Sequence, residues 1–529
     1  MQGEDDAATP AASRGRIVML VDNGVTIDSR VQKAAQSAAE AGWEVHLIGC
    51  TFGGRPKSWT LGKAKVRLVP VPTTLEGPPR RWVRSQLRRP LAYADAGTAA
   101  YRRRLVQSRR SDLAASRLTL KAGPASPRAV WLMGRRVAAK VQQRWVGLRE
   151  RQTRSLAKAR SNPDSPVERL AIGFWQRLLG DRCWRVLDRS LWDWETAYGK
   201  VIDKLRPDII HANDFRMLGV GARAALRARA KGRDVKLVWD AHEFVPGIRS
   251  WSVSPRWLPA MCAHEREYAG MADEVVTVSE PLGDLLVETH GLRKRPTVVL
   301  NAPIVGAPAS DDGEPVPDLR ELCGIGPDTP LAVYSGVASP QRGLDVMVEA
   351  LPKLPDLHVA LIVSKPKVEY VQELRARARE LGVADRLHVR GYVPFHQVVE
   401  LLSVADLGVI PIHHWPNHEI ALITKFFEYS HARLPIVVSD VKAMGEMVRA
   451  TGQGEVFRAE DVADYVRAVE AVLTDPARYR SVYDDRPDLL REWTWEAQAE
   501  VLDGVYGRLL AGTAGSDRSS SSPGRSGRS

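Results

Sequence analysis

Residues 16–48 read RIVMLVDNGVTIDSRVQKAAQSAAEAGWEVHLI. The apolar run at 16–21 has the length of a buried strand, and the Asp-Asn-Gly sequence at 22–24 is typical of a turn. Residues 28–41 then repeat small and apolar side chains at helical spacing, and 44–48 is a second apolar run. A strand, a helix and a strand in this order indicate a βαβ unit, whose strands must be parallel.

The same alternation of strand and helix patterns continues in two series along the chain. The first series adds strands at 208–211, 235–239, 274–278 and 297–300. The second series predicts strands at 331–335, 357–363, 386–390, 407–411 and 435–438, helices between them at 343–352, 367–382, 396–404 and 422–431, and final helices at 461–474 and 494–510. Two such series predict an α/β protein with two Rossmann-like, doubly wound parallel-sheet domains.

Composition sets the predicted boundaries of these domains. The tails at 1–14 and 512–529 are acidic and Ala-rich or Ser/Gly/Arg-rich, and we expect both to be disordered because such segments cannot bury a core. Between them we predict a first domain at 15–301, a Pro-, Gly- and Asp-rich linker at 302–330, a second domain at 331–492 and a crossover helix at 493–511. A helical insertion occupies residues 75–165 of the first domain, and an amphipathic helical stretch follows it at 166–206.

Positive charge is concentrated in this insertion. The whole chain has a net charge of +13, and residues 80–160 contain 22 Lys and Arg against 3 acidic residues, so the rest of the chain is slightly acidic. Arg80-Arg81-Trp82 and Gln143-Arg144-Trp145 each place a cation beside an aromatic ring. We expect an anionic partner, either a membrane surface or a polyphosphate, and the alternative is a solvated arm. Nucleic acid is not expected, because no recognition motif accompanies the charge.

The four cysteines argue for a reducing compartment. Cys50, Cys183, Cys262 and Cys323 are scattered, with no paired spacing that would predict disulfides or a zinc site. The N-terminus lacks a signal-peptide pattern, and no apolar run reaches the roughly 18 residues that a membrane span needs. We predict a cytoplasmic protein, with peripheral attachment to the inner face of the membrane as an alternative.

A series of short motifs occurs in a fixed order along the chain: Asp28-Ser29-Arg30-Val31, His211-Ala212-Asn213-Asp214, Asp240-Ala241-His242, residues 272–279, Asn301-Ala302-Pro303, Ser335-Gly336, Arg342-Gly343-Leu344, Gly391-Tyr392-Val393, Ala405-Asp406 and Lys425-Phe426-Phe427-Glu428-Tyr429. Together they resemble the motifs of glycosyltransferase family 4, whose members have the GT-B fold with two Rossmann-like domains facing a central cleft. The resemblance covers most of residues 15–510 except the insertion. It implies a nucleotide-sugar donor and an enzyme without metal or other cofactor, and the chain has no Asp-x-Asp motif.

The resemblance places the donor site in the second domain. Gly336 ends a predicted strand, where a missing side chain lets a diphosphate approach the backbone, and the guanidinium of Arg342 suits phosphate oxygens. The family usually has Lys at the position of Arg342 and an Arg directly after the glycine, where this chain has Val337. Lys425, or with less support Lys365, could replace that missing cation.

Ribose and base contacts are also implied by the resemblance. Glu428 matches a family glutamate that binds the ribose, since a carboxylate can accept two hydrogen bonds from a vicinal diol. The family often has a second glutamate eight residues earlier, where this chain has Ile420, and Glu419 is one position away. Tyr392 and Val393 would lie against the base.

Polar side chains follow a predicted strand of the first domain at Asp240, His242 and Glu243. Parallel sheets bind ligands at the carboxyl ends of their strands, so these residues are candidates for the reaction site. By resemblance, His242 would contact the transferred sugar and Asp240 would orient it, which with Arg342 gives the predicted catalytic set. The acceptor-side candidates are Asn23, Arg30, His211, Asp214 and Glu243.

The resemblance implies a retaining glycosyltransferase that moves a hexose-type sugar to a glycan or lipid-linked acceptor, in cell-envelope or exopolysaccharide biosynthesis. Two alternatives use the same fold. One is a nucleotide-sugar 2-epimerase, which acts on the donor alone. The other is a GT-B scaffold that has lost its chemistry, for which Val337 and Ile420 are the support.

Overall fold

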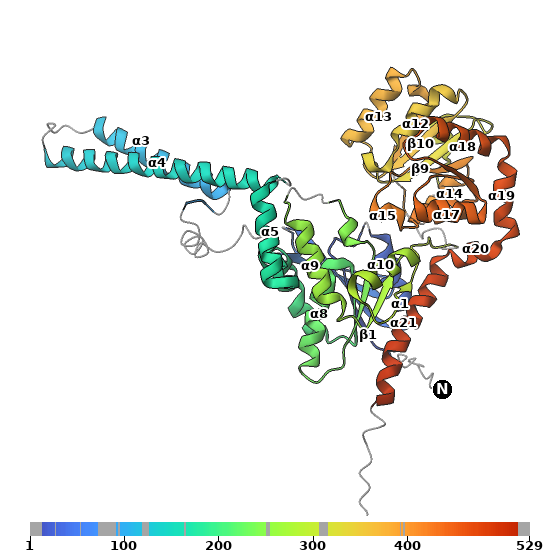
Figure 1. Ribbon diagram of the computed structural model, residues 1–529, viewed down its shortest axis with the longest axis horizontal. Coiled ribbons are helices and arrows are strands. Elements are labelled where there is room, and N and C mark those ends of the chain that lie inside the picture. Colours follow the sequence, from blue (N-terminus) through green and yellow to red (C-terminus); the bar gives the residue numbers. More distant parts are fainter. Residues whose placement is uncertain are drawn as a thin grey trace, which may run out of the picture. The chain divides into compact units, whose positions relative to one another are not determined.

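The computed structural model describes residues 13–26, 28–52, 54–71, 91–93, 96–118, 126–162, 165–249, 254–305, 316–391, 393–394 and 397–516 (Figure 1). The chain forms two compact units. The first consists of residues 1–71, 194–248 and 264–529, and the second consists of residues 72–193 and 249–263. The first unit contains two separate β-sheets, and the second is helical.

The first sheet has the strand order β3-β4-β2-β1-β5-β6-β7-β8. Its strands are β1 (Arg16–Leu20), β2 (Glu44–Phe52), β3 (Lys57–Leu61), β4 (Ala64–Val71), β5 (Ile209–Asn213), β6 (Lys236–Ala241), β7 (Glu274–Thr277) and β8 (Thr297–Val298). All pairs are parallel except β3 with β4. β3 and β4 were not predicted, because β4 alternates buried and exposed side chains along most of its length rather than forming an apolar run.

The helix α1 (Ser29–Glu40) follows β1 as the sequence predicts. The Asp28 carboxylate accepts a hydrogen bond from the backbone N–H of Val31 at 3.2 Å, which caps the helix. Val31 and four alanines are buried on one face against β1, β2 and β4. Further helices of the first sheet are α8 (Asp214–Arg229), η2 (Val245–Gly247), α9 (Trp257–Ala269) and α10 (Glu280–His290).

The second sheet is entirely parallel, in the order β11-β10-β9-β12-β13-β14. Its strands are β9 (Leu331–Gly336), β10 (His358–Val363), β11 (Leu387–Gly391), β12 (Leu407–Ile410), β13 (Ile436–Ser439) and β14 (Gly454–Phe457), of which β14 was not predicted. Its helices are α11 (Leu319–Cys323), η3 (Pro340–Arg342), α12 (Asp345–Ala350), η4 (Leu351–Lys353), α13 (Glu369–Glu380), η5 (Ala384–Arg386), α14 (Val398–Leu402), α15 (Pro416–Glu419), α16 (Thr424–His431), α17 (Lys442–Thr451), α18 (Val462–Thr474), α19 (Pro476–Asp485) and α20 (Pro487–Glu492). The two parallel sheets confirm the predicted fold class.

Two helices outside the predicted second domain each pack into the core of one of the two sheets. Within the predicted linker, α11 buries Leu319 and Cys323 in the core of the second sheet, so this part of the linker belongs to that domain. Residues 306–315 of the linker lie outside the described residues. The last helix, α21 (Trp495–Ser516), buries Trp495 and Tyr506 in the core of the first sheet.

The second unit contains the long helices of the basic segment. Figure 1 shows α3 (Ala96–Leu118) lying alongside α4 (Pro127–Ser161), and small apolar clusters join the two. The stretch 166–206 is not one amphipathic helix. It divides into α5 (Pro166–Leu179), η1 (Gly180–Cys183), α6 (Trp184–Leu187) and α7 (Leu191–Leu205), because Gly180 adopts a left-handed φ of 54° and ends α5.

Candidate active site

Asp240 lies at the carboxyl end of β6 and is almost completely buried. Its two carboxylate oxygens accept hydrogen bonds from Nε and Nη2 of Arg30 at 3.1 and 2.9 Å, and Arg30 comes from α1. Arg30 also donates to the carbonyl of Val299 at 2.8 Å. Burial would raise the pKa of Asp240, but Arg30 and His242 hold this pKa well below its ordinary value. Asp240 is therefore a permanent buried anion.

His242 lies between two carboxylates. Its Nε2 is 3.3 Å from Asp240 Oδ2, and its Nδ1 is 3.4 Å from Asp214 Oδ2. Burial opposes the charged form, but Asp214 and Asp240 hold the pKa of His242 well above its ordinary value. His242 is therefore held as a cation between two carboxylates rather than poised to accept a proton.

His211 is the third partner of Asp240, after Arg30 and His242, and it links Asp240 to the last helix. Its Nε2 is 3.4 Å from Asp240 Oδ2, and its Nδ1 is 2.8 Å from the hydroxyl of Tyr506 in α21. An ionised Asp240 only accepts, which matches the tautomer with the proton on Nε2, and in that tautomer Nδ1 accepts from the hydroxyl of Tyr506. Sequence analysis missed Tyr506, since nothing in the sequence relates it to a histidine 295 residues away.

Replacing Tyr506 with Phe should move the pH dependence of activity. Tyr506 and His211 are fully buried, so the variant leaves Nδ1 of His211 without its partner, which costs about 1–3 kcal/mol of stability. A less firmly held His211 fixes Asp240 less firmly beside His242, so the pKa of His242, which this carboxylate raises, should fall. In a profile of kcat/KM against pH, the loss of activity on the alkaline side should then begin at a lower pH.

Tyr483→Phe is the matched control for this variant. Tyr483 is also buried, and its hydroxyl donates to the carbonyl of Leu434 at 2.7 Å. A comparable loss of stability with an unchanged pH profile is expected there. If both variants leave the profile unchanged, Tyr506 has only a structural role.

The remaining acceptor-side candidates differ in how exposed they are. Asn23 holds the loop after β1, donating to Asp28 and accepting from the N–H of Val25, both at 2.8 Å. Asp214 begins α8 with a left-handed φ of 61°, an unusual conformation for a residue other than Gly. Glu243 is exposed at the rim. Partial desolvation of its carboxylate, together with Asp214, raises the pKa of Glu243 to about 7, although His242 and Arg342 partly oppose this. Asn23 and Arg30 are thus held by the protein itself, whereas Glu243 remains open to a ligand.

At the second sheet, Gly336 and Lys425 lie together at the carboxyl end of β9. Gly336 has a φ of 128°, and a Cβ added there would lie only 3.0 Å from Lys425 Nζ. Lys425 donates to the hydroxyl of Tyr334 at 3.1 Å and lies over its ring. Burial, with Arg342 nearby, holds the pKa of Lys425 well below its ordinary value. A phosphate beside Gly336 would restore the charge of this amine.

Arg342 ends η3 and is followed by Gly343, at which any side chain would clash. A Cβ at Gly343 would lie 2.0 Å from the carbonyl oxygen of Pro411, so this residue must be glycine for the turn that carries Arg342. Within the described part of the chain, the Arg342 guanidinium forms no ion pair. Val337 is 59% exposed and supplies no charge. Arg342 is therefore a cation that is available to a ligand.

Glu428 lies on α16 and is buried. Burial raises its pKa, and Lys425 and Lys33 partly offset that effect. Lys33, which sequence analysis missed, donates to the carbonyl of Ala302 at 2.5 Å and lies over the ring of Trp495. Burial, together with Arg30, lowers the pKa of Lys33 to about 7. The only sequence signal for Lys33 was its position on the apolar face of α1.

Three other predicted positions have different outcomes. Glu419 accepts from the backbone N–H of Lys442 at 2.8 Å and lies 2.6 Å from His414 Nδ1, so it holds the start of α17. Val393 is partly buried against the core of the second sheet. Tyr392 lies outside the described residues.

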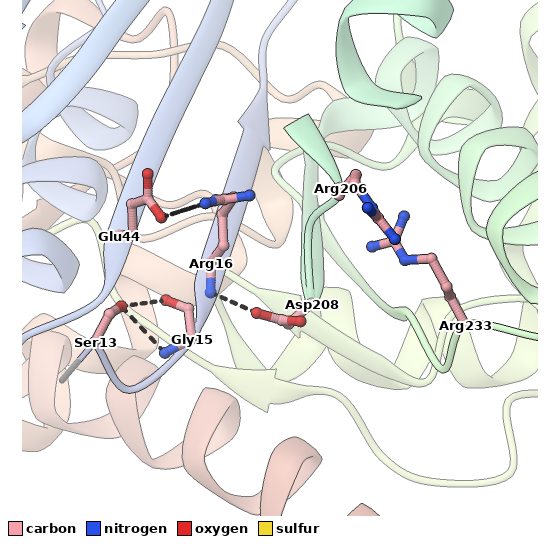
Figure 2. Close-up of a pocket in the computed structure, with 7 residues that line it drawn as sticks. All are labelled: Ser13, Gly15, Arg16, Glu44, Arg206, Asp208 and Arg233. Carbon is pink, nitrogen blue, oxygen red and sulfur yellow. Dashed lines mark hydrogen bonds and ion pairs between the residues drawn. The ribbon is translucent and has the colours of Figure 1, made fainter. Parts of the chain in front are cut away.

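A separate hollow of about 490 Å³ lies at the amino ends of β1 and β2 (Figure 2). Its lining residues are Ser13, Gly15, Arg16, Glu44, Arg206, Asp208 and Arg233. Arg16 and Glu44 begin β1 and β2, whereas the candidate residues lie at the carboxyl ends of the strands. This hollow is therefore distinct from the candidate active site.

The described residues contain no group of three or more His, Cys, Asp and Glu side chains that could hold a metal ion. Nor do they include a helix that is long and apolar enough to cross a membrane.

Two family models match the chain. The model described as Glycosyl transferases group 1 matches residues 317–486, and the model described as Glycosyltransferase Family 4 matches residues 156–304. The glycogen synthase of Mycobacterium tuberculosis is 27% identical over 303 residues, which cover 57% of this chain and 69% of that protein.

Solved structures share the fold. The sucrose-phosphate synthase of Thermosynechococcus elongatus superposes with a TM-score of 0.59 at 15% identity, covering 94% of this chain and all of the other. The Anabaena protein HepE, solved in complex with UDP and glucose, gives a TM-score of 0.55 at 12% identity, covering 93% of this chain and all of the other.

Proposed function

We propose that this chain, which is a GT-B glycosyltransferase of the family 4 type, transfers a sugar from a nucleoside-diphosphate sugar to a glycan or lipid-linked acceptor with retention of configuration. The observation that carries the proposal is the grouping of Gly336, Lys425, Arg342 and Glu428 at one end of the second sheet. Such groups are those that a diphosphate and a ribose require. We propose a role in cell-envelope or exopolysaccharide biosynthesis.

The donor would bind with its diphosphate beside Gly336. Arg342 and Lys425 would offset the charge that develops on the leaving diphosphate, and Glu428 would accept hydrogen bonds from the ribose hydroxyls. The structure of HepE with UDP and glucose makes a uridine nucleotide the first donor to test. No metal or other cofactor is included in this proposal.

In the transfer itself, the bond between C1 of the sugar and the diphosphate oxygen breaks, and a bond forms between C1 and the acceptor oxygen. The acceptor hydroxyl gives its proton to an oxygen of the leaving diphosphate, so no protein nucleophile is required. The cation His242, fixed by Asp214 and Asp240, would contact the transferred sugar. Glu243, with a pKa of about 7, would face the acceptor.

Thermal unfolding in the presence of nucleotides tests this donor site. Uridine, guanosine, adenosine and thymidine diphosphates and their sugars are compared, and a ligand at one hundred times its Kd should stabilise the protein by about 2.7 kcal/mol. Glu428→Gln should weaken binding of the stabilising nucleotide about 10- to 100-fold, because charged hydrogen bonds to the ribose are lost. Glu470→Gln, a change at an exposed helix position, should not.

The outcomes separate the alternatives. Stabilisation by no nucleotide, in a folded sample, would indicate a scaffold without chemistry. Conversion of the donor sugar in the absence of acceptor would indicate an epimerase. Full binding by Glu428→Gln would remove Glu428 from the ribose site.

A further inference from the structure

The helix α4 carries an apolar stripe that the described structure leaves exposed. Its members are spaced three or four residues apart and are each 44–69% exposed: Val130, Met133, Val137, Val141, Trp145 and Leu148. That spacing places them on one face of the helix. The stripe extends for about 27 Å at 1.5 Å per residue.

The opposite face of α4 already packs against α3. Leu132 and Ala139 are buried with Leu113, and Val146 is buried with Val106 and Ala99. The helices α3 and α4, which lie side by side in Figure 1, thus pack together through one apolar face of α4. The stripe is a second apolar face of α4 that takes no part in this packing. A row of exposed apolar side chains of this length indicates a binding surface.

Charge indicates what kind of surface this face would meet. The helices α3 and α4 contain sixteen Lys and Arg residues and two acidic residues. Lys140, Arg144 and Arg151 are exposed and, at helical spacing, border the stripe on one side. An apolar face bordered by cations is typical of helices that lie in the interface of an anionic bilayer.

A neighbouring helix repeats the pattern. On α5, Val167, Leu170, Phe174 and Leu178 are 57–75% exposed at spacings of three and four residues. Arg169 and Arg177 lie on the same helix. The second unit therefore carries two such faces on separate helices.

We propose that α4 docks on an anionic phospholipid surface, with the stripe inserted among the acyl chains and its bordering cations at the phosphates. A second copy of the chain would place strongly cationic helices against each other, which repulsion disfavours. Nucleic acid would bind the cations but leave the apolar side chains exposed. The inference extends the proposed function, on which its biological meaning rests, since a lipid-linked acceptor lies in such a surface.

Cosedimentation of the full chain with vesicles tests the proposal. The wild type should bind vesicles of phosphatidylcholine mixed with phosphatidylglycerol and dissociate from them when salt is added. It should bind vesicles of phosphatidylcholine alone at least about tenfold more weakly. The triple variant Val137→Ser, Val141→Ser, Trp145→Ser keeps every charge and should bind the mixed vesicles at least about tenfold more weakly than the wild type. Leu226→Ser with Val501→Ser, at exposed apolar positions of the first unit, is the matched control and should bind as the wild type does.

Thermal unfolding and nucleotide binding are measured on all three proteins. Both should be unchanged in the variants. If the wild type binds no nucleotide, the proposed donor site is overturned and the vesicle result is unaffected. Undiminished vesicle binding by the triple variant, or no preference of the wild type for anionic vesicles, overturns the lipid surface. Sedimentation of the wild type as a dimer that the triple variant dissociates would assign the stripe to a second copy instead.

Discussion

Asp240→Asn should lower the free energy of unfolding by about 3–5 kcal/mol, because it leaves the buried guanidinium of Arg30 without its counter-charge. Both side chains of this pair are at most 5% exposed, and Arg30 contacts both oxygens of Asp240. The amide that replaces the carboxylate has the same shape, so the effect measures charge and not packing. Chemical unfolding at neutral pH gives the value.

Asp284→Asn is the matched control for this prediction. Asp284 pairs with Arg295 at 2.8 Å, but both side chains are more than half exposed. The loss there should be at most about 1 kcal/mol. A similarly small loss in Asp240→Asn would mean that solvent reaches the Arg30–Asp240 pair.

The pH dependence of stability gives an independent check on Asp240. Its folded-state pKa is lowered, so its stabilising contribution is present above the unfolded-state pKa and is lost as the pH falls through the folded value. The difference between wild type and Asp240→Asn should therefore be full at neutral pH and shrink only in strong acid.

The sequence was sufficient for those parts of the fold that rest on local patterns. Apolar runs predicted β1, β2 and β5–β8 of the first sheet and β9–β13 of the second. β4 was missed because it alternates buried and exposed residues along most of its length. The position of His242 after a buried strand was likewise visible in the sequence. The partner of the neighbouring Asp240 was not visible, because Arg30 reaches Asp240 from 210 residues away.

The second sheet shows the same limit. The sequence could suggest Lys425 as the missing cation, and the structure places its amine beside Gly336. It could not show that Glu419 holds the start of α17, since that depends on the hydrogen bond from Lys442. Lys33 is the clearest case. From the sequence, this lysine would be interpreted as a solvated charge, because its partners Ala302 and Trp495 are distant along the chain and only the fold places them beside it.

Arg342→Gln should lower kcat by about 100- to 1,000-fold, the usual effect of removing one preorganised donor to a developing negative charge. Arg342 forms no ion pair among the described residues, so its charge does not stabilise the fold and the variant should unfold at the temperature of the wild type. Arg342→Lys keeps the charge and should retain most of the activity.

The division of the effect between kcat and KM decides how Arg342 acts. If it only held the diphosphate in the ground state, Arg342→Gln would raise KM and leave kcat unchanged. If it stabilises the leaving diphosphate, whose negative charge grows as the bond to C1 breaks, kcat must fall. Transfer without a protein nucleophile depends on that leaving group. Lys425, whose pKa is held well below its ordinary value by burial and by Arg342, is the other nearby amine or guanidinium that a diphosphate could charge. An unchanged kcat in Arg342→Gln would therefore transfer the catalytic role to Lys425.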